Sequence, residues 1–535
     1  MKHASLPLKT VLFSIVFFLL AITPIWAQTE KESNNDFASA NLVPFTGEAF
    51  GSVCPGDVDY FKIVLPRDGV VRVNMKVTNT GAGYGTLHVS GYDQRQASGN
   101  LFNSTPAYST NTNSELEANT DVFCRSAGDT IYLSVQPESQ CFSYKLSFSM
   151  PGEATEKDAE DNNDFLRSIT FNIGDTVRGH IGYWSGAGTK DAVDYFKTVL
   201  PQDGRYRIIM EATNTGNGYG SMYVTGYDQR KENGNLLNST PAYSTYIGAT
   251  TFDSVDLFCR SAGDTLYFKV TQNSQCFSYK ITYKLVSEPA ENDTEPNNTF
   301  QQAHFFNIGD TARGHIGYVA GGGVTDATDV YKTVLPQDGK YRIIMEATNT
   351  GNGYGSLYVS GYDQRMETGN LFNATPAYST YSESRTIDSL DLFCRSAGDT
   401  LYFKVTQNSQ CFNYKITYKL IGTPSDNDVE PNNSFQEALY LAENDTARGH
   451  IGYVAGGDVT DQVDYYKFVV PKNGIVKVYM EGTNTGNGYG SLYVTGYDQR
   501  QDNGNLFNAT PAYSIYSNQT TSEVATLYGR SAGDT

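Results

Sequence analysis

The sequence predicts an all-β protein made of four tandem antiparallel β-sandwich domains, the last of them truncated. Composition is the first observation behind this prediction, because 51 glycines and 39 tyrosines among 535 residues are typical of strands joined by turns. The other two observations are a long internal repeat and an alternation of apolar with polar residues inside each copy.

The repeat defines the domains. The segment TNTGNGYGSMYVTGYDQR begins at Thr213, returns almost unchanged at Thr348 and Thr483, and has a looser copy at Thr78. Its period of 135 residues is the length of an independent domain rather than of a solenoid repeat. We therefore predict β-sandwich domains at residues 28–150, 151–287, 288–422 and 423–535, separated by acidic joints that contain Pro or Gly.

Alternation places strands inside each domain. In YKITYKL, the residues Tyr279, Ile281 and Tyr283 share one face of an expected strand, and polar residues occupy the other. Turn signals such as PQDG, GNG and SAGD separate these runs. The fourth copy stops in RSAGDT, where the others continue into two closing strands. Because a sandwich without those strands would expose edges and core, we expect this chain to be a fragment of a longer precursor.

The first 27 residues predict a secretory signal peptide. Lys2 and Lys9 precede an apolar run from Val11 to Trp26, and small Ala27 follows it. A membrane anchor is the alternative, but a run interrupted by Pro24 is shorter than the ~20 residues of a spanning helix. We expect a secreted or cell-surface protein with no transmembrane segment after cleavage.

The net charge of the chain argues against one class of binding partner. The formal net charge of −19 repels phosphate backbones, so nucleic acid is not an expected partner. Cations are favoured instead.

An acidic arrangement recurs at the entry of every domain, with acidic residues at two alternate positions, Asn at the next alternate position and a second Asn directly after it. Side chains at alternate positions of an extended segment point to the same face, and like charges there repel unless a cation lies among them. The four sets are Glu30, Glu32, Asn34 and Asn35; Asp158, Glu160, Asn162 and Asn163; Asp293, Glu295, Asn297 and Asn298; Asp428, Glu430, Asn432 and Asn433.

A second acidic pair follows in each domain, just before an apolar and aromatic strand. These pairs are Asp57 and Asp59, Asp191 and Asp194, Asp326 and Asp329, and Asp461 and Asp464. Carboxylate and amide oxygens, without clustered His or Cys, are the ligands of a hard cation, and Ca²⁺ takes six to eight of them. The alternative is a solvated acidic linker beside a turn that the Asn residues cap.

The segments EPNNSFQEA, DQVDYYKFVVPKNG and SAGDTLYFKV, with the closing YKITYKL, resemble the bacterial pre-peptidase C-terminal (PPC) domain. This family is related to the collagen-binding domains of secreted clostridial collagenases. The resemblance covers nearly all of each domain and implies a jelly-roll-like β-sandwich and secretion. In its calcium-binding members it implies a site built from the entry segment and the acidic pair, which here means the residues named above.

Two regions depart from the family pattern. Domain one has GDVDYFK, so Asp57 and Asp59 are two residues apart rather than three, and the loop before them is shorter. The TNTGNGYGS and NLFNATPAYS segments in the middle of each domain are also less typical of the family. Tyr219, Tyr227 and Tyr243 lie in or beside such segments and could stack on sugar rings or line a collagen-like groove. The alternative is that they pack within the sandwich.

No catalytic constellation is present. HExxH, GxSxG and P-loop motifs are missing, and His180, His315 and His450 of the recurring GHIGY have no recurring nucleophile near them in sequence. We expect no enzymatic activity within these residues.

Cysteines placed to form disulfide bonds are typical of secreted proteins. Three pairs lie seventeen residues apart, Cys124 with Cys141, Cys259 with Cys276 and Cys394 with Cys411, which predicts one bridge inside each domain and leaves Cys54 over. A fully extended strand between paired positions would hold them ~20 Å apart, so this pairing requires the flanking loops to fold back.

The sequence therefore predicts a secreted, non-catalytic array of calcium-stabilised β-sandwiches. Such an array would bind an extracellular protein or polysaccharide, or space a distal domain from the cell surface. The rival interpretation makes these domains accessories of a secreted peptidase or other hydrolase whose catalytic domain lies beyond residue 535.

Overall fold

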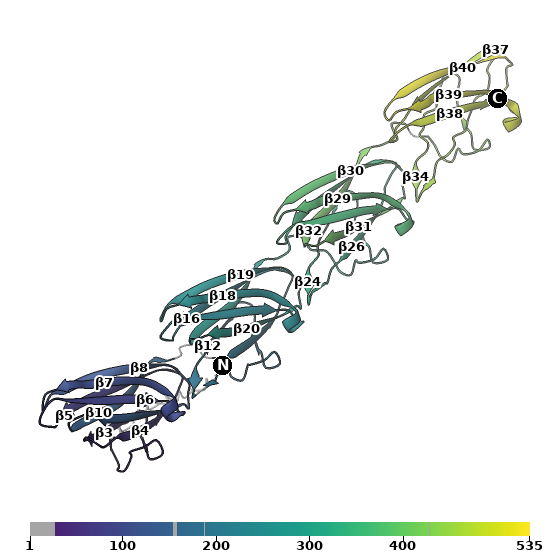
Figure 1. Ribbon diagram of the computed structural model, residues 1–535. Helices are drawn as coiled ribbons and strands as arrows, with labels where there is room; N and C mark the ends of the chain where they lie inside the picture. Colours follow the sequence, from purple (N-terminus) through teal and green to yellow (C-terminus); the bar gives the residue numbers. More distant parts are fainter. Residues whose placement is uncertain (1–26, 154–157, 187, 427) are drawn as a thin grey trace, which may run out of the picture.

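The chain forms a row of four β-sandwich modules in a computed structural model that describes residues 27–153, 158–186, 188–426 and 428–535 (Figure 1). We call the repeats modules one to four; they span 27–153, 158–287, 288–422 and 423–535. The predicted signal peptide lies almost wholly in residues 1–26, outside these ranges. In the described part of the chain, no helix has the length and apolar character needed to cross a membrane.

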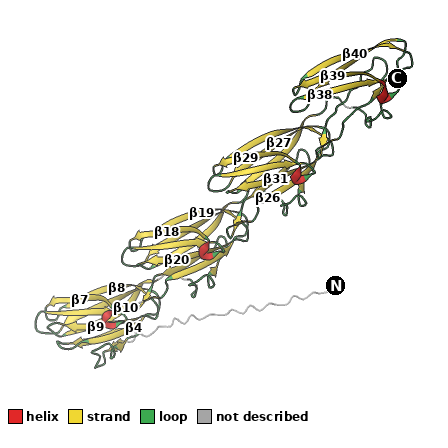
Figure 2. Cartoon of the chain, turned by 45° about the vertical axis from the view of Figure 1, so that its right-hand side comes forward, coloured by secondary structure: helices red, strands yellow, loops and turns green. Residues whose placement is uncertain are grey.

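The fold class is confirmed. The described residues form strands, loops and four short 3-10 turns at Gln96–Ser98, Lys231–Asn233, Met366–Thr368 and Gln501–Gly504 (Figure 2). The strands of module one are β1 Ala27–Thr29, β2 Asn41–Leu42, β3 Glu48–Val53, β4 Asp59–Val64, β5 Gly69–Asn79, β6 Gly85–Tyr92, β7 Asn100–Thr110, β8 Glu115–Arg125, β9 Thr130–Pro137 and β10 Phe142–Glu153. Strand β10 continues three residues past the predicted domain end at 150.

Modules two and three repeat this order with an added hairpin. Module two contains β11 Ile169–Thr170, β12 Thr176–Ile181, β13 Trp184–Ser185, β14 Gly188–Thr189, β15 Val193–Val199, β16 Gly204–Asn214, β17 Gly220–Tyr227, β18 Asn235–Thr245, β19 Thr250–Arg260, β20 Thr265–Asn273 and β21 Phe277–Ser287. Module three contains β22 His304–Phe305, β23 Thr311–Ile316, β24 Val319–Ala320, β25 Gly323–Val324, β26 Thr328–Val334, β27 Gly339–Asn349, β28 Gly355–Tyr362, β29 Asn370–Thr380, β30 Arg385–Arg395, β31 Thr400–Asn408 and β32 Phe412–Gly422.

Two sheets face each other in each complete module. In module two, one sheet has the order β11-β15-β20-β17-β18 and the other has β12-β21-β16-β19. The neighbouring long strands pair antiparallel. The alternation read from the sequence is confirmed, because Tyr279, Ile281 and Tyr283 of β21 are buried in the core while Lys280 and Lys284 lie outside it. Burial of these large apolar faces holds the two sheets together.

Module four has the same strands up to residue 530, except that residues 446–451, the counterpart of β23, form no strand. They are β33 Leu439–Tyr440, β34 Val454–Ala455, β35 Asp458–Val459, β36 Tyr466–Lys467, β37 Gly474–Thr483, β38 Gly490–Tyr497, β39 Asn505–Ile515 and β40 Thr520–Arg530. In module two, β20 and β21 are central strands of their sheets. The described residues of module four place no strand there. Apart from hairpin β34–β35, which joins the sheet of module three, the strands of module four form only two-stranded pairs. Val478 is consequently only half-buried, whereas its counterpart Ile343 is fully buried.

In each module after the first, a short hairpin pairs with the edge of a sheet in the preceding module. Strands β13 and β14 of module two join the sheet of module one, where Trp184 pairs in parallel with Arg125 of β8. The amide of Ser126 donates to the carbonyl oxygen of Trp184 at 2.8 Å. Hairpins β24–β25 and β34–β35 join β19 and β30 in the same way. The hairpin covers an edge that would otherwise be open, so adjacent modules share a continuous sheet.

The predicted cysteine pairing is wrong. Cys124 bonds to Cys276 and Cys259 to Cys411, so two disulfides link successive modules. The leftover Cys54 bonds to Cys141 within module one, and Cys394 is a free thiol. Two cysteines that are seventeen residues apart lie at opposite ends of the strand between them. The cysteines that come together at a joint belong to two different modules.

We expect non-reducing peptide mapping of the chain to recover Cys124 with Cys276, Cys259 with Cys411 and Cys54 with Cys141. A thiol reagent should modify about one cysteine per unfolded, unreduced chain, namely Cys394, because the other six are paired. Recovery of a Cys124–Cys141 or Cys259–Cys276 peptide would contradict the joint described here.

Candidate metal centres and the joints between modules

Four carboxylates converge at the entry of module three. Asp293 and Glu295 come from the entry segment, Asp326 follows hairpin β24–β25, and Asp329 lies in β26. One oxygen from each lies within 4.8 Å of the others. The sequence prediction that the entry segment and the second acidic pair meet therefore describes the observed geometry.

Several oxygens at this centre are buried without a hydrogen-bond donor among the described residues. Asn297 is fully buried, and its Nδ2 donates to Asp293 Oδ2 at 2.9 Å while its Oδ1 accepts nothing. Oδ1 of Asp326 and Oδ1 of Asp329 are likewise unpartnered. Because burying an unpaired polar atom costs free energy, these oxygens identify a place where a ligand would be stabilised.

Burial and repulsion by neighbouring carboxylates raise the pKa values of Asp326 and Asp329. Desolvation, followed by the charges of Asp293 and Asp326, raises the pKa of Asp329 to about 10. Desolvation and the charges of Asp293 and Glu295 raise the pKa of Asp326 to about 7. A bound cation would reverse this balance by stabilising the charged forms.

A buried tyrosine that the sequence analysis assigned only to the core supports each complete centre. Tyr414 of β32 donates to Asp329 Oδ2 at 2.5 Å. Gly314 makes room for this contact, since a Cβ there would lie 2.4 Å from the Tyr414 hydroxyl oxygen and 2.9 Å from Asp293 Cγ. Recurrence of Gly in RGHI and of Tyr in the closing YKITYK was the sequence signal for this arrangement.

Modules two and four repeat the centre with three converging carboxylates each, Asp158, Glu160 and Asp194 in one and Asp428, Glu430 and Asp464 in the other. Asp191 and Asp461 fall outside these groups, but they have buried unpartnered oxygens. Burial and the charges of Glu160 and Asp158 raise the pKa of Asp191 to about 7. Asn162 and Asn432 are fully buried with an unpartnered Oδ1, as Asn297 is.

Module one has a different arrangement. Glu32, Asp57 and Asp59 converge, but Glu30 instead accepts hydrogen bonds from Tyr144 at 2.6 Å and from the Ser52 amide at 2.8 Å. The buried side chain of Asn34 has no partner among the described residues.

The second Asn of each entry segment is at least partly exposed. Asn298 and Asn433 are exposed and donate through Nδ2 to Glu295 and Glu430. Asn163 donates to Asp161, and Asn35 is exposed. These amides orient or flank the acidic residues.

The donor set is made of oxygens alone, drawn from carboxylates and one amide per module. Such a set fits a hard cation, and the crowding of acidic residues favours Ca²⁺ over the smaller Mg²⁺, which requires near-ideal octahedral geometry. In module three, the residues able to hold it are Asp293, Glu295, Asn297, Asp326 and Asp329.

A histidine connects each centre to the preceding module. Nε2 of His315 lies 2.8 Å from Asp203 Oδ2 of module two, and its Nδ1 lies 3.1 Å from the Glu291 carbonyl oxygen. Burial opposes protonation of this ring, but the hydrogen bond with Asp203 and the charge of Asp293 raise the pKa of His315. His180 with Asp68 and His450 with Asp338 repeat the contact at 2.6 and 2.7 Å.

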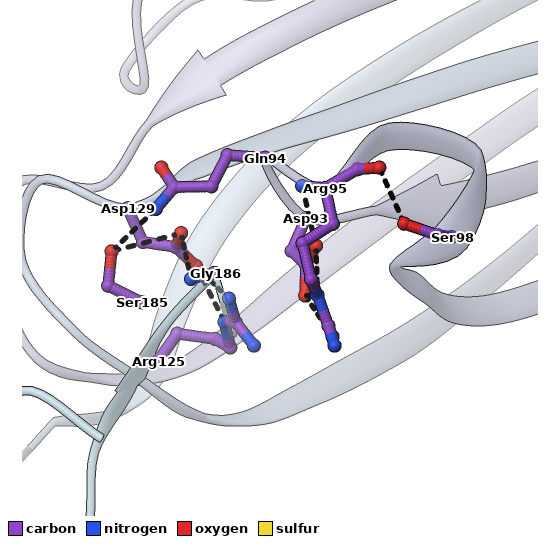
Figure 3. Close-up of polar contacts among 8 residues, drawn as sticks. All are labelled: Asp93, Gln94, Arg95, Ser98, Arg125, Asp129, Ser185 and Gly186. Atoms are coloured by element: carbon purple, nitrogen blue, oxygen red, sulfur yellow. Dashed lines mark hydrogen bonds and ion pairs between the residues drawn. The ribbon is translucent and has the colours of Figure 1, made fainter. Parts of the chain in front are cut away.

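The YDQR turn of module one contacts the β13–β14 hairpin of module two (Figure 3). Asp93 is buried and accepts hydrogen bonds from the Arg95 guanidinium, which fixes the turn. Gln94 then donates to Ser185 of module two at 3.3 Å. Beside it, Asp129 pairs with Arg125 and accepts a hydrogen bond from the Gly186 amide at 3.2 Å. The motif therefore holds a turn and also contacts the next module.

The outward face of module four lacks two of these joint residues. Gly529 occupies the place of Cys124, Cys259 and Cys394, and Asn473 occupies the place of Asp68, Asp203 and Asp338. Asn473 keeps the turn, because its Oδ1 accepts a hydrogen bond from Ala532 as the aspartates do from Ala127, Ala262 and Ala397. Asn473 has no negative charge with which to pair a histidine, whereas Asp68, Asp203 and Asp338 each contact one.

The three tyrosines singled out in module two separate into two classes. Tyr227 is buried and contacts the ring of Phe165 at a centroid distance of 5.5 Å. Tyr219 and Tyr243 are exposed over 53% and 74% of their surface. Packing explains the first, and the other two remain available to a ligand.

Comparisons with known proteins identify no family for this chain. No protein-family model and no curated protein sequence matches the chain, so membership of the PPC family stays a prediction. Among solved structures, a tandem of two CBM22 domains from Paenibacillus barcinonensis is 10% identical with a TM-score of 0.17, covering 50% of this chain and 100% of its own. The structure of Sulfolobus turreted icosahedral virus is 12% identical with a TM-score of 0.13, covering 68% and 84%. Similarity at this level supports no functional argument.

Replacing Asp329 with Asn should remove about one equivalent of bound calcium per chain while leaving the other modules' sites intact. Asn can still accept the hydrogen bond from Tyr414 but offers a weaker, neutral ligand. Calorimetric titration of the calcium-stripped chain checks this, with exposed Asp388→Asn in β30 as the control. Equal calcium stoichiometry in all three proteins would show that these carboxylates hold no ion.

The calcium-free chain should lose stability as the pH rises from about 4 to about 7. Unfolded Asp titrates near ~3.9, whereas the pKa values of folded Asp326 and Asp191 are about 7. Between these values the folded state binds more protons than the unfolded state, so stability falls with increasing pH. Thermal unfolding in chelator checks this; a rise in melting temperature over that range would contradict the assignment.

Proposed function

We propose that this chain is a secreted, non-catalytic rod of calcium-stabilised β-sandwich modules that spaces its two ends and presents copies of one surface to an extracellular polymer. The observation that carries the proposal is the joint between modules, in which three separate contacts meet. A borrowed hairpin extends the sheet, a histidine pairs with an aspartate, and a disulfide links modules one with two and two with three.

Each contact restricts a different motion. The hairpin fixes the direction in which the next module leaves, since backbone hydrogen bonds of a shared sheet are directional. The disulfide limits separation of the modules, and on the loop-entropy model its closure of a long loop stabilises the joint by about 5 kcal/mol. The His–Asp pair places opposite charges in a half-buried setting, where screening by solvent is weaker.

Calcium would act on the same joint. Each centre that includes an entry segment lies where the chain passes from one module to the next, and His315 lies 3.9 Å from Asp293 at its Nδ1. Neutralising the carboxylates would order the entry segment, and the segment's Glu291 carbonyl oxygen orients the histidine. Disulfides between modules fit an oxidising, extracytoplasmic environment, which supports secretion.

Small-angle X-ray scattering of residues 28–535 tests the rod. We expect a single extended particle in calcium, and we expect the triple variant His180→Gln, His315→Gln and His450→Gln under reducing conditions to show a broader distribution of lengths. His304→Gln, at β22 and away from the joints, is the matched control. Scattering typical of freely jointed beads from the unmodified chain in calcium would contradict the proposal.

A further inference from the structure

Modules two, three and four each expose a pair of tyrosines in contact. The ring centroids of Tyr219 and Tyr246 lie 4.1 Å apart, and those of the counterpart pairs lie 4.1 and 4.0 Å apart. The counterparts are Tyr354 with Tyr381 and Tyr489 with Tyr516. All six rings are more than half exposed. We call each pair a tyrosine platform.

The first tyrosine of each platform ends a rigid loop. In module two, the fully buried Asn214 donates through Nδ2 to the carbonyl oxygens of Gly218 and Thr245 and accepts from the Gly216 amide. A Cβ on Gly216 would lie 2.0 Å from Gln275 Oε1, so glycine at this position lets the Gln275 side chain pack against the loop. Asn349 and Asn484 repeat these bonds.

The second tyrosine follows a strained serine. Ser244, Ser379 and Ser514 adopt φ values of 48°, 48° and 49°, a conformation that is unfavourable for a residue with a side chain. A hydroxyl on the neighbouring strand supports each kink, since the Ser244 amide donates to Ser221 Oγ at 3.0 Å and Ser379 and Ser514 repeat the bond. The strain is held in three modules together with the exposed pair that it positions.

Module one has no such platform, because Asn111 occupies the place of Tyr246. Its remaining exposed tyrosines, Tyr84 and Tyr108, form no ring contact with each other. An exposed tyrosine pair contributes little to a fold, so its retention beside a strained backbone in three modules indicates a ligand.

We propose that the tyrosine platforms bind a neutral polysaccharide. A tyrosine ring offers an apolar face to the C–H face of a sugar and a hydroxyl to its polar rim. The loop residues around the platforms of modules two and four, TGNGY with YIGA or YSNQ, carry no charge. The chain's net charge of −19 disfavours anionic polymers, so an uncharged sugar chain is the complementary ligand.

The joints give the platforms a fixed spacing. In module three, Glu383 lies two residues after Tyr381 and pairs with Arg205 of module two at 3.2 Å, so this platform lies beside the joint. A repetitive polymer that reaches several platforms gains avidity, which can exceed single-site affinity by about 10²–10⁴-fold. This ligand assignment deepens the proposed polymer binding but does not depend on the length of the rod measured by scattering.

Affinity electrophoresis and pull-down of residues 28–535 in calcium test the proposal, with mannan, β-1,3-glucan, xylan, cellulose and chitin as probes. We expect binding to at least one of them. The triple variant Tyr246→Asn, Tyr381→Asn and Tyr516→Asn, which copies Asn111 of module one, should lose about a hundredfold in affinity. Each single variant should lose about tenfold or less. The exposed Tyr440→Asn is the control and should bind as the unmodified chain does.

Three results would overturn the assignment: no binding to any of these probes, unchanged binding by the triple variant, or binding to gelatin or heparin alone. Melting temperatures of all variants should agree, because the replaced rings are exposed. A failed sugar assay together with rod-like scattering would remove the ligand and leave the spacer function standing.

Discussion

At the entry of module three, Asp326 and Asp329 are buried close to other carboxylates, and burial and repulsion together disfavour their charged forms. Asp329 is fully buried, and its neighbours Asp293 and Asp326 lie within reach of the same point. The repulsion between these carboxylates is relieved either when some of them bind protons, as the raised pKa values describe, or when a cation binds among them. The proposed function takes the second, since Asn297, which donates to Asp293, also has a buried oxygen without a partner among the described residues.

The rest of the array is organised around these centres. In module three the entry segment supplies acidic residues to the candidate centre, and its Glu291 carbonyl oxygen contacts His315, which in turn contacts Asp203 of the module before. The hairpin and the YDQR turn also contribute to each joint, and a cystine links modules one with two and two with three. Modules one and four differ from modules two and three. Module one closes Cys141 with its own Cys54, and module four has Gly529 and Asn473 in place of the cysteine and aspartate of the other modules.

Sequence reasoning succeeded where a feature is local and periodic. The 135-residue repeat and the alternation in YKITYKL determined the module number and the β-sandwich architecture, and the alternate acids of DNDVEPNNSF indicated the entry centre. It failed where contacts cross a joint. Cys124 and Cys141 are neighbours in the repeat, but the bond forms between Cys124 and Cys276 because the ends of two modules meet there. Nor does alternation distinguish Tyr227, which packs on Phe165, from exposed Tyr219.

The most direct test of the cation-centred account is anomalous X-ray diffraction from crystals of residues 28–535 grown in calcium. The account predicts an anomalous peak among Asp293, Glu295, Asn297, Asp326 and Asp329, with matching peaks in modules two and four. Clear density for these side chains with no peak at saturating calcium would contradict it, and would show that protons alone resolve the repulsion between the buried carboxylates.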